Sequence, residues 1–476
     1  MSIKKDKGRE MTRKKKTGNF ILVVLFLLFT GLYISLVFNK NVWTDEAYTI
    51  QLVRENNFVG IVKNTAIDVH PPLYYLIVKM ITFVFGDSIC VYKIVSVIPM
   101  LLTMLFAFFC VKSWWGKQAA VTFLIMVNAI PCVLEYVVQI RMYSWAMFFV
   151  TWAGLGAYGL CRKKQTKYGT WLAVASLFAC YTHTYAMVSC VCIYFLVCID
   201  LLCGVKGKKK LRLLKQVLLS GGIVAICYLP WLVVLIRQTT DRIDNYWIEP
   251  VTGQEIAQYF SFLFASQVPY STALYLILCG LAVVTCIYRS FKKDKDATAA
   301  LLMLGVPLLT AGIGIVISIL VTPFFIARYL VPCMGLLAIF FAMAFRKKSK
   351  YVQGLLAVFG IGMVCYSYQQ NFLAEYKSTH TEELLAFMDD NMENEDVIVY
   401  NYEVYGFIYR IYFDGNRVKF LNDVDFSENV ATLWYFDSCV TPWLDSQVLE
   451  QYGWKKEYIM TTGIEHNEFH LYKIEK

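Results

Sequence analysis

One stretch of the sequence decides how the rest is interpreted: Trp43-Thr44-Asp45-Glu46-Ala47-Tyr48 and, further along, Asp68-Val69-His70-Pro71-Pro72-Leu73-Tyr74-Tyr75. It follows an apolar run, 20–38, that is long enough to cross a lipid bilayer. Carboxylates, an imidazole and two prolines therefore stand together where the chain leaves the membrane. A protein that only spans the membrane has little use for such a group there, so we interpret the stretch as a catalytic loop.

The composition indicates a polytopic α-helical membrane protein. Of 476 residues, 58% are hydrophobic and 17% are charged, and the mean hydropathy is +0.51. A soluble chain is roughly half apolar and about a quarter charged. The net charge of +10 comes from short basic clusters between apolar runs, which is typical of cytoplasmic loops. This pattern argues against a nucleic-acid partner.

We expect about eleven membrane-spanning helices, each close to the ~20 residues that a bilayer requires. The predicted runs are 20–38, 90–111, 119–136, 143–160, 170–182, 185–202, 213–236, 272–288, 299–321, 329–345 and 352–368. Together they make a transmembrane domain over 20–370. A basic segment, 1–19, precedes it and is expected to be cytoplasmic.

The run 72–85 is apolar but short, and it carries Lys79 and begins with two prolines. If it crossed the membrane, every later basic loop would lie outside. If it lies along the interface instead, all of those loops face the cytoplasm, as the positive-inside rule requires. We therefore expect interfacial helices in a first extracytoplasmic loop, 39–89. The same reasoning places the N-terminus inside and the C-terminus outside the cell membrane.

The tail, 371–476, is expected to lie in water and not in the membrane, because it is polar and its acidic residues outnumber its basic ones. Short runs typical of strands occur at 397–400, 418–421, 432–436, 457–461 and 468–474. Helical patterns occur at 382–388 and 404–412. We expect a small extracytoplasmic α/β domain with one modest core.

Asp45 and Glu46 have two readings. Carboxylates next to a helix start often cap the helix or are simply solvated. In the other reading, Asp45 deprotonates an acceptor hydroxyl or holds a metal, with Glu46 supporting it. His70 is likewise either an incidental residue of a rigid turn or an imidazole that contacts phosphate or metal, oriented by Asp68.

Five more residues are expected at outer helix ends and are candidates for binding phosphate. The ordinary alternative is that arginines at such places only extend toward lipid headgroups. Cations that gather on one outer face can bind a phosphate or pyrophosphate. The candidates are Arg141, Tyr143, His183, Arg328 and Tyr329.

The two opening motifs, followed by Arg141-Met142-Tyr143-Ser144, Tyr181-Thr182-His183-Thr184-Tyr185 and Ala327-Arg328-Tyr329-Leu330-Val331-Pro332, resemble the C superfamily of membrane glycosyltransferases. The resemblance covers roughly 15–370 and is nearest to bacterial protein-mannosyltransferase-like and aminoarabinose-transferase-like enzymes. It implies a polyprenyl-phosphate sugar donor, a catalytic Asp in the first outer loop, and interfacial helices in that loop. It leaves a divalent metal open, since the second outer loop has Arg141 where the family often has an acidic residue.

The resemblance therefore implies a glycosyltransferase of the hexosyl or pentosyl type acting at the extracytoplasmic face. A single displacement assisted by one base, Asp45, would invert the anomeric configuration. Its acceptor would be a glycan, a lipid or a protein. The alternative is a transporter or flippase for a lipid-linked glycan. Transporters place ionisable residues near the bilayer midplane, whereas here they collect at the ends of the predicted spans. This difference favours the enzyme.

Overall fold

The computed structural model describes residues 2–39, 41–163, 165–204, 207–241, 248, 250–264, 269–373, 380–426, 432–464 and 467–476. The chain folds into two compact units. The first unit comprises Met1–Phe38 and Phe58–Asn371, and the second comprises Asn39–Asn57 and Phe372–Lys476. The segment 39–89, expected as one loop, is thus divided between the units after Asn57.

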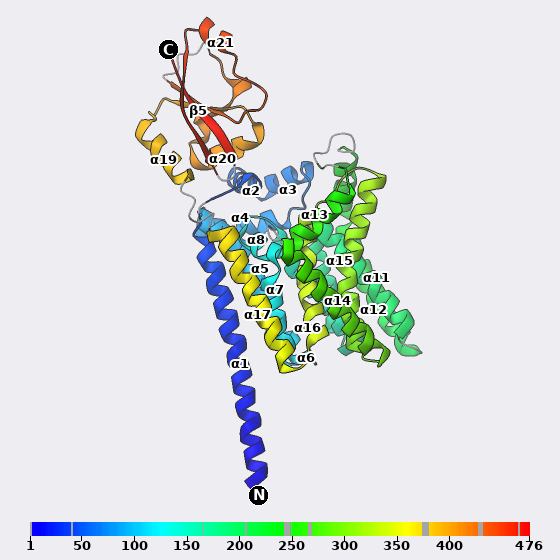
Figure 1. Ribbon diagram of the computed structural model, residues 1–476. Coiled ribbons are helices and arrows are strands. Elements are labelled where there is room, and N and C mark those ends of the chain that lie inside the picture. The colour runs from blue at the N-terminus through cyan, green and yellow to red at the C-terminus, as the bar shows by residue number, and fades with distance from the viewer. Residues whose placement is uncertain are drawn as a thin grey trace. The chain divides into compact units, whose positions relative to one another are not determined.

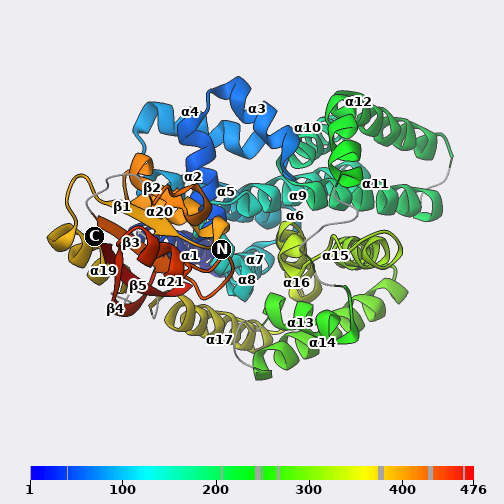
Figure 2. The same cartoon turned by 90° about the horizontal axis from the view of Figure 1, so that it is seen from above.

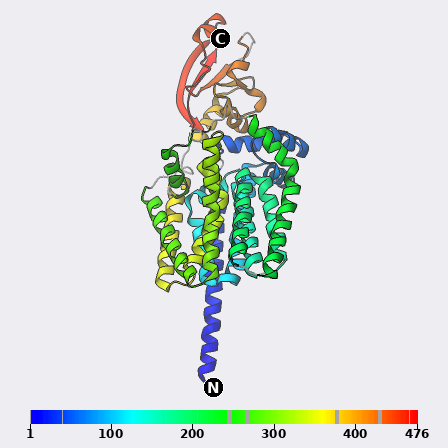
Figure 3. The ribbon, with the colours of Figure 1, turned by 90° about the vertical axis from the view of Figure 1, so that its right-hand side faces the viewer.

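Long apolar helices make up most of the first unit and run side by side in Figures 1 and 3. They are α1 (Ser2–Val37), α5 (Ile89–Phe106) continuing through η1 (Ala107–Val111) and α6 (Lys112–Trp115), α11 (Thr184–Gly204), α12 (Lys208–Thr240), α14 (Pro269–Phe291), α15 (Lys295–Leu320), η3 (Ala327–Cys333) continuing into α16 (Met334–Phe345), and α17 (Lys350–Ser367) followed by η4 (Tyr368–Leu373).

Within the described ranges, eight helices are long and apolar enough to cross a membrane. A ninth span results if α7 (Lys117–Ala129) and α8 (Pro131–Val138) count as one span, although they meet at a bend of 70°. Pro131 at the first position of α8 accounts for the break, because proline cannot continue the hydrogen-bond ladder of α7.

The two remaining predicted spans correspond to α9 (Tyr143–Tyr158), which continues into η2 (Gly159–Lys163), and α10 (Lys167–Thr182). Neither qualifies as a span by length and hydropathy. The α10 helix has 16 residues and rises only ~24 Å, and α9 is rich in Tyr, Trp and Gly. Both pack inside the bundle, α9 against α5 and α11, and α10 against α9 and α12 (Figure 2).

Two short apolar helices, α3 (Phe58–Ile67) and α4 (Leu73–Phe85), follow in the first unit. Both run crosswise to the long helices in Figure 1. The α4 helix coincides with the run that the sequence assigned to the membrane interface. A further short helix, α13 (Gly253–Phe264), precedes α14. The predicted fold class, a polytopic helical protein with a small C-terminal sheet, is confirmed.

The second unit contains a five-stranded sheet in the order β2-β1-β3-β5-β4, whose long β4–β5 hairpin is red in Figure 3. Strands β1 (Val397–Tyr400), β2 (Val418–Phe420) and β3 (Thr432–Asp437) are parallel, whereas β4 (Lys455–Ile464) and β5 (Asn467–Glu475) add antiparallel pairs. Each lies on a predicted strand. The register pairs Tyr400 with Phe436 and Tyr435 with Tyr472.

Helices and short turns connect these strands. They are α19 (His380–Asn391), η5 (Glu403–Tyr405), α20 (Gly406–Tyr412), η6 (Gly415–Arg417), η7 (Leu421–Asp423) and α21 (Ser446–Gln451). One core of the unit joins Leu433, Tyr435 and Ile474 of the sheet to Leu449 of α21. The N-terminal segment of the unit contributes α2 (Thr44–Glu55), which packs against α20.

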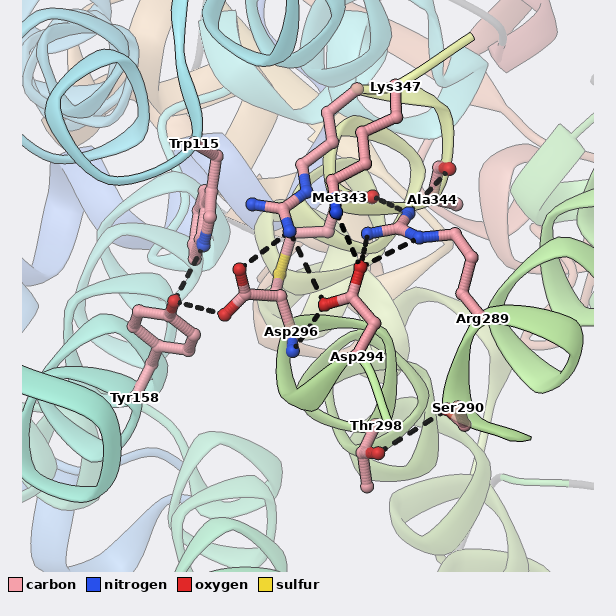
Figure 4. Close-up of polar contacts among 11 residues, drawn as sticks. Trp115, Tyr158, Arg289, Ser290, Asp294, Asp296, Thr298, Met343, Ala344 and Lys347 are labelled. Atoms are coloured by element: carbon pink, nitrogen blue, oxygen red, sulfur yellow. Dashed lines mark hydrogen bonds and ion pairs between the residues drawn. The ribbon is translucent and has the colours of Figure 1, made fainter. Parts of the chain in front are cut away.

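At one end of the first unit, charged side chains from α14, α15 and the end of α16 form an ion-pair network (Figure 4). Arg289 Nη2 lies 2.8 Å from Asp294 Oδ2, and Arg346 Nη2 lies 2.7 Å from Asp296 Oδ2. Arg289 also donates hydrogen bonds to the last carbonyl groups of α16. These contacts connect the loop after α14 with the loop after α16, both of which are expected in the cytoplasm.

Candidate active site

The corner between α3 and α4 carries His70. Pro71 and Pro72 restrict the backbone directly before α4, and the last turn of α3 is held by Gln238 of α12, whose Nε2 donates to the carbonyl oxygen of Thr65 at 2.9 Å. His70 is 8% exposed, and its Nε2 lies 3.1 Å from Arg141 Nη2. A guanidinium group only donates hydrogen bonds, so His70 Nε2 accepts and the ring is neutral.

Arg141 belongs to the short connection between α8 and α9, and it is 3% exposed. Its backbone N–H donates to the carbonyl oxygen of Gln139 at 2.7 Å, which holds the connection in a tight turn. Tyr143 begins α9 directly afterward. The bend that ends α7 and the start of α9 therefore bring Arg141 to the corner that carries His70.

His183 lies between α10 and α11 and is 1% exposed. Its Nδ1 accepts a hydrogen bond from the backbone N–H of Tyr185 at 3.0 Å, so the proton of the neutral ring is on Nε2. Nε2 is buried and has no hydrogen-bond partner among the described groups. Burial, followed by the positive charges of Arg141 and Arg328, lowers the pKa of His183 to about 3. The ring is thus a neutral donor at physiological pH.

Aromatic contacts gather these residues around His183. Its ring centroid lies 5.6 Å from that of His70, 5.4 Å from that of Tyr143 and 5.2 Å from that of Tyr329. Arg328 precedes Tyr329 in η3 and is close enough to influence the pKa of His183. We call the set His70, Arg141, Tyr143, His183, Arg328 and Tyr329 the arginine–histidine cluster.

The structure thus brings together all five predicted phosphate-binding residues and His70, from four separate segments of the first unit. Asp68 precedes His70 in the same corner and is half-buried. Two arginines, one imidazole N–H and two phenol groups are the donors that phosphate oxygens accept. The cluster is therefore suited chemically to bind an anion.

Asp45 and Glu46 lie in the first turn of α2, which belongs to the second unit. The helix is preceded by Trp43, whose backbone N–H donates to Glu46 Oε2 at 3.1 Å. Glu46 is 4% exposed and closes the helix start from the third helical position. Asp45 is half-buried and is not the capping residue. The joint action of Asp45 with the arginine–histidine cluster stays a prediction.

No group of three or more His, Cys, Asp or Glu side chains with an arrangement suited to a metal occurs in the described part of the chain. The Nε2 of His70 contacts Arg141, a pairing that competes with metal ligation at this atom. Asp68 and His70 therefore form no three-ligand group among the described residues, and no step below passes through a metal.

Sequence reasoning missed two residues that shape the cluster. Tyr185 stacks on Tyr329 with ring centroids 5.0 Å apart, and its backbone N–H sets the tautomer of His183. Gln238, 7% exposed, fixes the end of α3 ahead of His70. Tyr185 stands within one of the quoted motifs. Gln238 stands just beyond a predicted span, and its polar amide at that place is the signal that could have identified it.

Comparison with solved structures identifies ArnT from Cupriavidus metallidurans in the apo state, with a TM-score of 0.61, 10% identity, and coverage of 94% of this chain and 97% of that one. The same protein bound to undecaprenyl phosphate has a TM-score of 0.59 and 12% identity over the same shares. The arabinofuranosyltransferase AftD from Mycobacteria has a TM-score of 0.49 and 10% identity, covering 96% of this chain and 40% of that one.

A scan with protein-family models found no match, and neither did a search of curated protein sequences. The likeness to ArnT nevertheless extends over nearly the whole of both chains, including the long helices and the C-terminal unit. The chain thus shares the fold of these ArnT structures, which agrees with the fold expected from its sequence motifs.

Proposed function

We propose that the protein is a glycosyltransferase that moves a sugar from a polyprenyl-phosphate donor to an acceptor at the extracytoplasmic face of the membrane. The observation that carries this proposal is the arginine–histidine cluster, in which the buried Nε2–H of His183 has no partner among the described groups. An unsatisfied buried donor costs about 1–3 kcal/mol, which a ligand oxygen recovers. One of the similar ArnT structures is bound to undecaprenyl phosphate, which supports this class of donor.

In the proposed reaction, the cluster binds the lipid phosphate. Arg141 and Arg328 supply positive charge, and His183 Nε2 donates a hydrogen bond without carrying a charge itself. The phosphate is the leaving group when the bond between its oxygen and the anomeric carbon breaks. Because this group is a weak base, cationic contacts that stabilise the developing charge suffice, and no general acid is required.

The acceptor hydroxyl requires a base, and we assign this role to Asp45. Asp45 accepts the hydroxyl proton while the acceptor oxygen bonds to the anomeric carbon and the lipid phosphate departs as an anion. A single displacement of this kind inverts the anomeric configuration. Glu46 supports the reaction by closing the first turn of the helix that carries Asp45.

The test is turnover by the purified protein with labelled polyprenyl-phosphate hexoses and pentoses, offered with glycan, lipid and peptide acceptors. We expect Asp45→Asn to insert normally and to lose at least ~10²-fold in turnover, the usual scale for a general base. Glu46→Gln should lose less. Near-normal turnover by Asp45→Asn, or a product with retained configuration, contradicts the assignment of the base. Movement of intact donor across vesicles without sugar transfer would indicate the flippase instead.

The orientation of the chain has its own test. Cys439 is an exposed thiol of the second unit, and Cys203 is an exposed thiol at the end of α11 that we expect in the cytoplasm. A membrane-impermeant maleimide applied to intact cells should label Cys439 and not Cys203. Permeabilised cells and the Cys439→Ser variant are the controls. Protection of Cys439 in intact cells would overturn the extracytoplasmic placement.

A further inference from the structure

The helix that carries Asp45 belongs to the same compact unit as the C-terminal sheet, and it packs against α20. At this contact the ring of Tyr48 meets the ring of Phe407 edge to face, with centroids 5.5 Å apart and planes at 88°. Such aromatic pairs stabilise a contact beyond the burial of their surface. With 12 residues, α2 is too short to be stable without packing of this kind.

The α20 helix is itself fixed on the sheet. Tyr409 is 1% exposed, and its ring lies 4.8 Å from that of Phe436 in β3 and 5.5 Å from that of Tyr400 in β1. A Cβ atom at Gly406 would collide with the Tyr400 ring, so the start of α20 lies directly against this side chain of β1. Phe407 and Tyr409, two positions apart, point to nearly opposite sides of the helix. Tyr409 therefore faces the sheet and Phe407 faces α2.

The contact also sets the rotation of α2. Tyr48 follows Asp45 by three positions, and residues at this spacing lie on the same side of a helix. Whatever fixes the Tyr48 ring therefore fixes the direction in which the Asp45 carboxylate points. The contacts run without a break from the sheet through Tyr409 and Phe407 to Tyr48 and the first turn of α2.

We propose that the C-terminal α/β domain is the positioning element for the Asp45 helix, with Tyr48 and Phe407 as positioning residues. This inference rests on the proposed function, since it assigns the domain a task in the same reaction. It gives the domain a purpose other than acceptor recognition, namely to hold the general base in one orientation.

Phe407→Ala tests the proposal. We expect kcat to fall about 10-fold, since base catalysis depends steeply on geometry, while the KM for the lipid donor stays within about twofold because the arginine–histidine cluster is unchanged. The combined exchange Tyr48→Phe with Phe407→Tyr keeps the aromatic pair and should restore most of the kcat lost in Phe407→Ala. Phe413→Ala is the matched control, because it removes a ring that packs on Phe436 of the same sheet.

Hydrogen–deuterium exchange of the α2 amides provides a readout that does not depend on activity. We expect exchange across 44–55 to rise about 3- to 10-fold in Phe407→Ala and to stay at the wild-type level in Phe413→Ala and in the exchanged pair. If β1 and β3 also lose protection, Phe407→Leu replaces Phe407→Ala.

The two readouts separate the possible failures. Unchanged α2 exchange, or raised exchange with unchanged kcat, overturns the positioning role. If the wild-type protein transfers no sugar, the proposed function fails, and the exchange data alone then decide whether the domain holds α2.

Discussion

Two clusters of polar side chains in the first unit differ in how their charges and hydrogen-bond donors are paired. In the ion-pair network of Figure 4, Asp294 and Asp296 pair with Arg289, Arg346 and Lys347, so guanidinium and ammonium groups meet carboxylates. In the arginine–histidine cluster, Arg141 donates to a neutral imidazole, and His183 keeps a buried N–H for which the described groups offer no acceptor. The Asp294 and Asp296 carboxylates thus have cationic partners within the protein, whereas the His183 N–H has no acceptor among the described groups.

The pKa shifts favour different charge states in the two groups: the charged form of Asp294 and the neutral form of His183. Burial opposes ionisation of Asp294, but hydrogen bonds from Arg289 and Lys347 outweigh it and hold the pKa of this carboxyl well below its ordinary value. At His183, burial and two neighbouring arginines favour the neutral form. Among the described groups, the Asp294 carboxylate has its cationic partners, whereas the buried His183 N–H has no acceptor.

The largest change in the KM for the lipid donor is expected when an arginine of the arginine–histidine cluster is removed. Arg328→Ala should raise the apparent KM for the lipid donor by roughly 30-fold, because a charge-assisted contact to phosphate contributes about 2 kcal/mol. Acceptor KM and the thermal midpoint should change little. Steady-state kinetics with each substrate varied in turn measures this split. An unchanged donor KM would exclude Arg328 from phosphate binding.

Disruption of the ion-pair network should lower stability and leave the KM for the lipid donor unchanged. Asp294→Asn should lower the free energy of unfolding by about 1–2 kcal/mol, reduced by partial solvent screening, because it leaves Arg289 without its charge partner. Donor KM should stay at the wild-type level. Asp241→Asn is the control, since the pair that Asp241 makes with Arg237 is exposed. A donor KM that rose with the loss of stability would remove the distinction between the two groups.

Variants of His183 examine the unused donor itself. His183→Gln keeps an N–H donor, whereas His183→Phe keeps a flat ring without one. We expect donor KM to rise about 10-fold in His183→Phe, the equivalent of one hydrogen bond of about 1.5 kcal/mol, and clearly less in His183→Gln. Equal effects of the two substitutions would show that the ring only fills space.

The last test uses pH and measures stability instead of donor binding. The folded pKa of His183, about 3, lies below its ordinary value of 6.5, so the unfolded chain binds a proton more readily. Stability from this group is therefore full above pH ~6.5 and declines as pH falls toward the folded value. Relative to His183→Gln, the wild-type protein should lose about 2 kcal/mol between about pH 7.5 and about pH 5. Thermal midpoints measured for both proteins across this range check the sign.

Local patterns were sufficient for the elements of the fold. Strand β1 occupies the predicted 397–400, and α4 coincides with the short run assigned to the interface. Burial on one side of a helix or strand leaves a period in the sequence, and membrane spans leave long apolar runs. The two predicted spans that do not qualify by length and hydropathy among the described residues are α9, which is rich in Tyr, Trp and Gly, and α10, which has 16 residues.

The residues that gather around His183 all stand in short motifs, so their side-chain types could be predicted from the sequence. The contacts could not: the folded structure shows that Arg141 donates to His70, that the proton of His183 is on Nε2, and that the Asp45 helix belongs to the same unit as the C-terminal sheet. His70 and Arg141 are 71 positions apart, and Tyr48 and Phe407 lie near opposite ends of the chain. Contacts across such separations arise from how whole helices pack, and a periodicity that repeats every few residues carries no record of them.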